Sequence, residues 1–284
     1  GMTVQMAADN GVRTSLQSYL GNLTQIKGGG VEKFWTDSEV FRCKGGNQQL
    51  AAKLAAGIGS NRVLLNSPVD SIIENGKIIS VKLADGKKIE ADEVVLAVPP
   101  SVWQRIAMEP PLPAPLAPQM GSNVKHLATM KKGFWKENKM NPDCLTDGPV
   151  CMTWDGTDNQ GAEGEMALVS FSGGPASEEC RQWKPEERDA KYLAELEVAF
   201  PGAKQNFVKG RFMDWPSDQW TNASYSFPAP GQVTTMGPIL REGQGRIHFA
   251  GEHACYAFVG YMEGALNSGA SLARRMAKKD GLIQ

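Results

Sequence analysis

The stretch "RIHFAGEHACYAFVGYMEGALNSGASLARRMAKK", Arg246 to Lys279, decides the fold of this chain. A short apolar run, Ile247 to Ala250, leads to a glycine and then to a carboxylate, Glu252. An aromatic loop follows, and the pair Gly260-Tyr261 opens a segment in which small and apolar residues recur with helical spacing. The pattern predicts a strand, a loop and a helix that packs on a sheet, as in the α/β class.

The predicted helix has an apolar face and an exposed start. Its face places Met262, Leu266, Gly269, Ala273 and Met276 at spacings of four, three, four and three, so this face is expected in the core. The first N–H groups of a helix lack intrahelical partners and lie at the positive end of its dipole. Such a start stabilises an oxygen that carries or gains negative charge.

Glu252, just beyond the predicted strand, has two interpretations. Its carboxylate accepts hydrogen bonds from a bound hydroxyl or ribityl chain, or it is a capping or ion-paired surface carboxylate. Composition alone favours the second interpretation, because glutamates are mostly exposed.

Charge and cysteine content exclude several classes of function. The 284 residues carry a net charge of -1 with scattered lysines and arginines, which argues against nucleic acid or a polybasic membrane surface. No apolar run approaches the roughly 20 residues of a membrane span. The five cysteines lack Cys-x-x-Cys spacing, which favours free thiols in a reducing compartment, so a cytoplasmic protein is expected.

The outer segments alternate between helix and strand patterns, and a proline-rich crossing at 110–119 introduces a middle of different character. Two interleaved domains are therefore expected. Periodicity and turn signals predict helices over 12–25, 48–56 and 185–200, and strands over 62–66, 77–83, 88–98, 125–130, 150–154, 166–172 and 207–213.

The C-terminal motif "FAGEH…GYMEGALNSGASLAR" resembles the flavin-binding signature of the flavin-containing amine oxidases, especially the monoamine oxidase type. Other segments resemble the same family in the same order along the chain. These segments are "CKGGNQQLAAKLA" (43–55), "NSPVDSI" (66–72), "VVLAVPPSVWQRIAMEPPLP" (94–113), "NVKHLATMKKGFW" (123–135) and "WTNASYSFPAPG" (220–231).

The resemblance implies an α/β (α+β) fold with two interleaved domains. Residues 37–100 and 236–284 are expected to form an incomplete FAD-binding domain that lacks its N-terminal βαβ unit. Residues 1–36 and 101–235 are expected to form a substrate-binding domain with a mixed sheet flanked by helices.

The resemblance also implies a reaction, in which hydride passes from the α-carbon of an amine to flavin N5 and oxygen reoxidises the flavin. Lys125 matches the lysine that holds a water at flavin N5, and Tyr225 and Tyr261 match two aromatics that flank the amine. Without the resemblance, Lys125 is a strand-edge lysine and each tyrosine a half-buried packing residue.

Cofactor contacts follow from the same resemblance, and no metal site is predicted. The Met262 N–H is expected to meet the pyrimidine oxygen of FAD. Ser224 stands where some members carry the cysteine that bonds the flavin, so FAD is expected to be noncovalent. The residues expected to bind the cofactor are Val69, Trp215, Gly251, Glu252, Gly260, Tyr261 and Met262.

One family motif is missing from this sequence. No strand–GxGxxG–helix pattern is present to bind a pyrophosphate, and "GIGS" at 57–60 follows a helix instead of preceding one. The chain is therefore expected to be the C-terminal portion of an oxidase and to bind FAD weakly or not at all alone. Part of the main sheet is expected to lie exposed or to be covered by a second copy in a homo-oligomer.

Three interpretations of the chain stay open: a fragment, one half of a split oxidase whose partner chain carries GxGxxG, or a non-catalytic binding module that kept the fold. The substrates are expected to be a small amine and oxygen. Gly260-Tyr261-Met262-Glu263 is nearer the monoamine pattern, while L-amino-acid and polyamine oxidases stay as alternatives.

Overall fold

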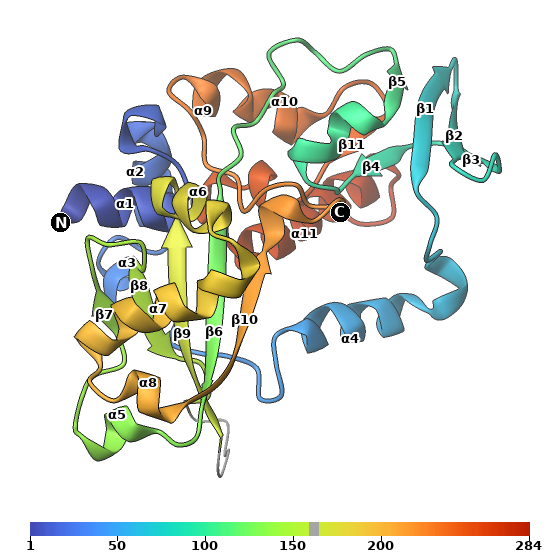
Figure 1. Cartoon of the computed structure of the whole chain (residues 1–284). Coiled ribbons are helices and arrows are strands. Elements are labelled where there is room, and N and C mark those ends of the chain that lie inside the picture. Colours follow the sequence, from blue (N-terminus) through green and yellow to red (C-terminus); the bar gives the residue numbers. More distant parts are fainter. Residues whose placement is uncertain (159–164) are drawn as a thin grey trace. The chain divides into compact units, whose positions relative to one another are not determined.

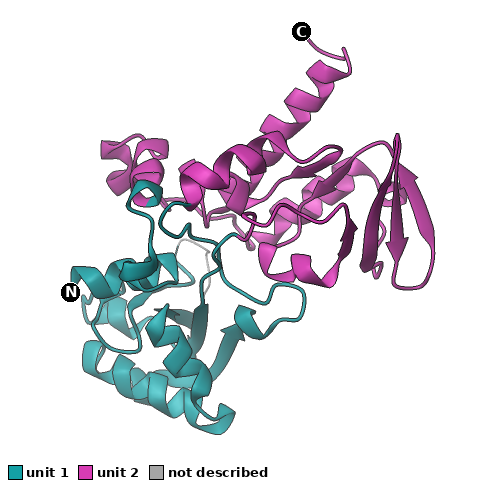
Figure 2. Ribbon diagram, turned by 90° about the horizontal axis from the view of Figure 1, so that it is seen from above, with its two compact units in different colours: residues 1–21, 118–231 teal, residues 22–117, 232–284 magenta. Residues whose placement is uncertain are grey.

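The computed structural model describes residues 1–158 and 165–284, and these form two compact units (Figure 2). Unit 1 comprises residues 1–21 and 118–231, and unit 2 comprises residues 22–117 and 232–284. Each unit is thus assembled from two segments that are distant in sequence. The described residues contain both helices and several β-sheets, which confirms the predicted α/β class.

Unit 1 is built on a five-stranded sheet in the order β10-β6-β9-β8-β7 (Figure 1). All neighbouring pairs run antiparallel, so the mixed sheet predicted for this part is wrong in that detail. The parallel pairs lie in unit 2 instead, where crossover connections join the paired strands. The strands are β6 (Asn123–Met130), β7 (Cys144–Leu145), β8 (Met152–Asp155), β9 (Met166–Gly173) and β10 (Phe207–Asp214).

Helix α7 (Pro185–Ala199) shows why the helices of unit 1 form where they do. Proline at its start and two glutamates in its first turn suit the helix N-terminus. It buries Tyr192, Leu193 and Leu196, which share one face. The other helical segments are α1 (Met2–Asn10), η1 (Thr14–Leu16), α5 (Phe134–Glu137), α6 (Pro175–Gln182), α8 (Ala203–Asn206) and η4 (Trp215–Ser217).

Unit 2 contains a four-stranded sheet, β3-β2-β1-β5, and a two-stranded parallel sheet, β11-β4. Asn75-Gly76 and Asp85-Gly86, which are turn signals in the sequence, turn the chain between β1, β2 and β3. Both glycines have positive φ. The strands are β1 (Val69–Asn75), β2 (Ile78–Leu83), β3 (Lys88–Ala91), β4 (Val94–Leu96), β5 (Ala107–Glu109) and β11 (Ile247–Phe249).

The core of unit 2 gathers side chains from both of its segments. Trp103, Phe249, Ile247 and Leu96 are buried in one cluster. The helical segments that lie wholly or mostly in unit 2 are α2 (Tyr19–Gly28), α3 (Glu32–Thr36), α4 (Gln48–Ile58), η2 (Ser60–Arg62), η3 (Pro100–Arg105), α9 (Gln232–Thr235), α10 (Gly237–Glu242), η5 (Glu252–Ala254), η6 (Tyr256–Phe258) and α11 (Met262–Lys279). None of the helices in the described ranges is both long and apolar enough to cross a bilayer.

Four predicted elements need correction. The strand expected over 88–98 is divided into β3 and β4, which belong to different sheets. The helix expected over 12–25 is divided, because the Ser18 side chain accepts a hydrogen bond from the Gly21 N–H and α2 starts anew beside it. The strand expected over 62–66 does not form, and its Leu64 and Leu65 are exposed. The helix expected to stop at Gly57 continues to Ile58, before Gly59 at a φ of 95°.

The units also divide the chain differently from the predicted domains. Residues 22–36, 101–117 and 232–235, expected with the substrate-binding domain, belong to unit 2. For residues 101–117 the physical reason is packing. Leu116 belongs to the buried cluster of unit 2, and Ile106 packs against that cluster.

Candidate functional site

The connection between β11 and α11 holds most of the predicted cofactor-binding residues. Gly251 (φ 140°) and Gly260 (φ 84°) have a backbone conformation that favours glycine. The Ser268 hydroxyl of α11 accepts a hydrogen bond from the Gly251 N–H at 2.9 Å and lies 2.8 Å from the Gly251 carbonyl oxygen. The end of the strand and the helix are therefore fixed to one another.

Glu252 closes this loop upon itself. One carboxylate oxygen, Oε2, accepts a hydrogen bond from the Gly260 N–H at 2.7 Å. Charge-assisted bonds of this kind are stronger than neutral ones. The bond lies within the loop and is not a helix cap, because the N-cap residue of α11 is Tyr261 and no side-chain cap hydrogen bond is present there. A role of Glu252 in binding a ligand stays a prediction.

Helix α11 starts directly after this loop, with half-buried Tyr261 at its N-cap position. The predicted core face of this helix is wrong: Met262 is 51% exposed and Leu266 is 39% exposed. The helix instead buries Gly264, Ser268 and Leu272. The reason is the close approach of the loop, because a Cβ added at Gly264 would lie 2.2 Å from the Phe258 carbonyl oxygen.

His253 is buried in the same loop, with its ring edge-on to Trp103 at a centroid distance of 5.4 Å. Among the described residues, its buried Nε2 has no hydrogen-bond partner. Burial lowers the pKa of His253 to about 4, because a charged imidazole would lose its hydration there. The ring is therefore neutral in the folded protein at pH 7.

We expect acid to destabilise the protein through His253. Its folded pKa lies below the unfolded value of 6.5, so the unfolded chain binds more protons as the pH falls below 6.5. The loss of unfolding free energy at pH 5 is expected to reach about 2 kcal/mol relative to pH 7.5. Urea denaturation at both pH values measures it. His253→Phe cannot titrate and should reduce the difference, and an unchanged difference would contradict this account.

Unit 1 carries three of the predicted site residues, and they lie in different surroundings. Lys125 is exposed on β6, with its Nζ 5.2 Å from the ring centroid of Trp154 and 5.8 Å from that of Phe171. These distances are those of cation–π contacts. Lys125 therefore differs from a simple solvated strand-edge lysine, because it has two aromatic neighbours, one from β8 and one from β9.

Tyr225 and Trp215 are the other two. Tyr225 is half-buried, follows a cis peptide bond after Ser224, and donates its hydroxyl proton to the Asp9 carbonyl oxygen. Trp215 opens η4 and is 46% exposed. Val69, by contrast, belongs to unit 2, where it packs against the same buried cluster as Ala254 of η5. Unit 2 thus brings five of the predicted cofactor-binding residues together in one loop and helix start.

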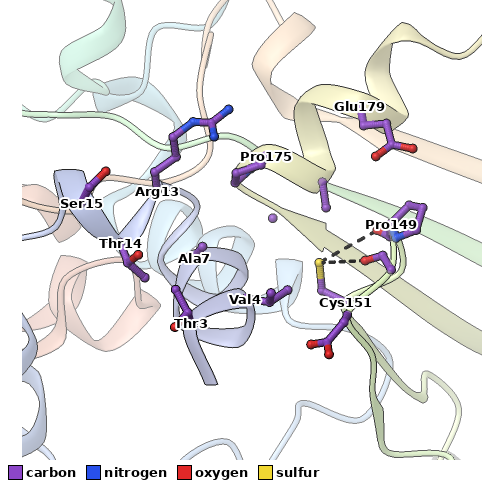
Figure 3. A pocket seen from close by; sticks show the side chains of 14 residues that line it. Thr3, Val4, Ala7, Arg13, Thr14, Ser15, Pro149, Cys151, Pro175 and Glu179 are labelled. Atoms are coloured by element: carbon purple, nitrogen blue, oxygen red, sulfur yellow. Dashed lines mark hydrogen bonds between the residues drawn. The ribbon is translucent and has the colours of Figure 1, made fainter. Parts of the chain in front are cut away.

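Unit 1 also has a pocket that the sequence did not predict (Figure 3). Its volume is about 490 Å³, and it contains none of the predicted site residues. Burial raises the pKa of the Cys151 thiol in its wall, which makes the thiol a poor nucleophile. The lining residues are Thr3, Val4, Ala7, Arg13, Thr14, Ser15, Asp147, Gly148, Pro149, Cys151, Gly173, Pro175, Ala176 and Glu179. No sequence motif predicts this pocket, because the residues that line it come from separate segments of the chain.

The described residues contain no group of three or more histidine, cysteine, aspartate or glutamate side chains arranged to hold a metal ion.

Comparisons with known proteins agree on one family. The family model described as flavin containing amine oxidoreductase matches residues 15–277. The probable flavin-containing monoamine oxidase A of Dictyostelium discoideum is 29% identical over 248 residues, which cover 84% of this chain and 53% of that protein. The flavin-containing amine oxidase B of Cavia porcellus is 30% identical over 84% of this chain and 47% of its own length.

Solved structures agree with this match. Cyclohexylamine oxidase from Brevibacterium oxydans superposes with a TM-score of 0.85 at 25% identity, over 98% of this chain and 63% of its own. Putrescine oxidase bound to putrescine gives a TM-score of 0.75 at 27% identity, over 82% and 53%. The chain thus spans about half the length of the curated relatives named above.

Proposed function

Because the chain belongs to the flavin containing amine oxidoreductase family, we propose that the complete protein oxidises small amines with FAD and oxygen. The observation that carries the proposal is the intact β11–loop–α11 unit, in which Gly260 and Tyr261 lead directly into the helix start. The names of the relatives, among them monoamine, cyclohexylamine and putrescine oxidases, support an amine as the substrate.

We propose that residues of unit 2 hold one end of a flavin. Met262 is the first residue of α11, where N–H groups lack intrahelical partners, which supports a contact of its N–H with a flavin oxygen that gains negative charge. The rest of the cofactor is not accounted for: Gly57 to Ser60 lie at the end of α4, not at the start of a helix after a strand. We therefore propose that FAD is noncovalent and needs a phosphate-binding segment in addition to this chain.

When bound, FAD would supply the acceptor for the hydride that leaves the α-carbon of the amine. We propose that Tyr225 and Tyr261 orient the amine and exclude water, since aromatic walls do both at little entropic cost. Lys125 is proposed to hold a water near the reacting flavin atom, and its position over Trp154 and Phe171 supports a fixed side chain. Val69, Trp215, Gly251 and Glu252 are proposed as further cofactor contacts.

The missing segment is proposed to be supplied by a partner chain or by the remainder of a longer protein. Apolar side chains exposed on unit 2 support this proposal, because such surface is usually covered. A second copy of the chain is the other proposed cover, giving a homo-oligomer. The exposed side chains include Leu54, Ile58, Val95, Val98, Met262 and Leu266. All five cysteines are free, which supports a reducing compartment such as the cytoplasm.

A complementation experiment tests the proposed function. The chain alone is expected to be colourless with little activity, and light scattering reports its association. Co-expression with the N-terminal segment of a relative is expected to give flavin absorbance and peroxide formation with monoamines. Polyamines and L-amino acids, tested beside them, separate the alternative substrate classes. Flavin binding without turnover of any amine would instead support the non-catalytic module, and stoichiometric flavin in the chain alone would contradict the need for a further segment.

Stopped-flow spectroscopy of the complemented protein separates the residue roles. Tyr261→Ala is expected to slow flavin reduction by amine about tenfold, because the amine is held less closely. Lys125→Met is expected to slow reoxidation by oxygen about tenfold instead. Trp220→Ala, an exposed tryptophan of unit 1, serves as a control. If Lys125→Met impairs reduction and leaves reoxidation unchanged, Lys125 has another role.

A further inference from the structure

One peptide group in unit 2 is held at both ends by side chains. The Val259 carbonyl oxygen accepts a hydrogen bond from Gln25 Nε2 at 2.9 Å. The Gly260 N–H, which belongs to the same peptide group, donates to Glu252 Oε2 at 2.7 Å. Gln25 is only 8% exposed and comes from α2, 234 residues earlier in the chain than Val259. The two bonds thus connect three separate elements through a single peptide plane.

Both bonds exist in only one orientation of this peptide. After a half-turn, the carbonyl oxygen would face the Glu252 carboxylate and the N–H would face the Gln25 amide donor. Gly260 alone would not prevent that rotation, since it lacks a Cβ and adopts a φ of 84°. The Gln25 amide could turn its own oxygen towards the N–H, but an ionised carboxylate only accepts hydrogen bonds. The bond to Glu252 therefore selects the orientation, and the bond from Gln25 stabilises it.

Helix α2 is itself fixed against the loop, which makes Gln25 a rigid anchor. A Cβ added at Gly28 would lie 2.4 Å from the Ala257 carbonyl oxygen, so the backbones of α2 and the loop are in direct contact there. Gln25 and Gly28 are three residues apart and share one face of α2. That face therefore meets the loop twice, at Ala257 and at Val259.

We propose that Gln25 and Glu252 are positioning residues, which clamp the Val259–Gly260 peptide and so set the direction in which Tyr261 leaves the loop. Its importance for turnover rests on the proposed function, in which Tyr261 orients the amine. Small displacements of an orienting group slow a reaction considerably, because near-attack geometry is demanding. Gln25 carries no family motif of its own in the sequence, and only its buried contact reveals the role.

Hydrogen exchange on the full chain tests the clamp without requiring activity. Gln25→Met removes the amide donor and keeps the side-chain length, and it is expected to speed exchange of the amides of 258–261 about tenfold, the cost of a typical buried hydrogen bond. Gln17→Met is the matched control, because Gln17 is also 8% exposed and donates to the Met6 and Val12 carbonyls at 2.9 Å, in unit 1. It should leave exchange in 258–261 unchanged.

Glu252 supplies a second, independent comparison. Glu252→Gln keeps an oxygen acceptor of the same shape and should preserve most of the protection, whereas Glu252→Met should lose about tenfold, as Gln25→Met does. This pair keeps the test valid if Gln25→Met fails to fold. Wild-type exchange at 258–261 in both methionine variants would overturn the clamp.

The complemented protein then tests the consequence for turnover. Gln25→Met is expected to lower kcat about tenfold and to change KM less than about twofold, while Gln17→Met changes neither. Faster exchange with an unchanged kcat would overturn the positioning role and leave the proposed function standing. If the wild-type complemented protein oxidises no amine, the proposed function fails, and the exchange result still decides whether the clamp exists.

Discussion

Replacing Trp135 with alanine is expected to lower the free energy of unfolding by about 4 kcal/mol, the range found for truncation of a large buried aromatic. Trp135 is fully buried in unit 1, edge-on to Phe134 at a centroid distance of 5.2 Å. Its Nε1 also donates to Asp155 Oδ2 at 3.2 Å, and Asp155 is only 3% exposed. The variant therefore leaves a cavity and removes a donor from a buried carboxylate.

Urea denaturation followed by far-UV circular dichroism measures this loss. Trp220→Ala is the control, because Trp220 is 56% exposed, and its cost should stay within about 0.5 kcal/mol. Trp135→Phe keeps most of the packing and loses the N–H group, so an intermediate cost is expected. Equal stability of the Trp135→Ala and Trp220→Ala variants would show that the burial of Trp135 does not stabilise unit 1.

Gly264→Val is expected to cost about 3 kcal/mol, the upper range for overpacking a filled interior. The side chain would meet a backbone carbonyl, at Phe258, rather than a flexible side chain, so the neighbour cannot easily move away. Helix α11 would have to shift from the loop that precedes it. Exchange of the amides of α11 should therefore accelerate together with those of η5 and η6.

A second glycine of the same helix gives a matched control for Gly264. A Cβ added at Gly269 would meet nothing within 4 Å. Gly269→Ala is therefore expected to be neutral or to stabilise by up to about 1 kcal/mol, because alanine favours a helix interior more than glycine does. If Gly264→Val is as stable as Gly269→Ala, the close packing at Gly264 does not exist in solution.

Local signals in the sequence predicted local structure well. The turns at Gly76 and Gly86 need only glycine after a polar residue, and α7 needs only its own spacing and first turn. The cofactor-binding candidates Gly251, Glu252, Gly260 and Tyr261 come from a family resemblance within one short stretch, and their role stays a prediction. The structure adds the contact between Glu252 and Gly260 within that stretch.

The face of α11 shows where the sequence was insufficient. Met262, Leu266 and Ala273 have helical spacing, but so do Gly264, Ser268 and Leu272. Hydrophobicity favours the first set, while the approach of the Phe258 carbonyl, which needs a glycine, selects the second. Periodicity cannot describe a contact with a preceding loop.

Contacts between distant segments were likewise outside the reach of the sequence. Trp154 and Phe171 come to Lys125 through the pairing of β6, β9 and β8, whose register no motif fixes. In the sequence, nothing distinguishes Gln25 from other polar residues of a helical segment. Its hydrogen bond to the Val259 carbonyl oxygen is visible only in the structure. Such roles depend on the tertiary fold alone.

The discontinuous make-up of the two units has a consequence for biosynthesis. All residues of unit 1 precede residue 232, so this unit can fold on the ribosome while translation continues. Residues 22–117 of unit 2 are synthesised before most of unit 1. Strand β4 can pair only after its partner β11 has been synthesised, and the loop after β11 can pack only after α11 has been synthesised. During that interval the early segment of unit 2 exposes apolar surface to chaperones and proteases. A slow ribosome over residues 118–231 would lengthen this interval, so codon usage there should influence the yield of folded protein more than codon usage after residue 232.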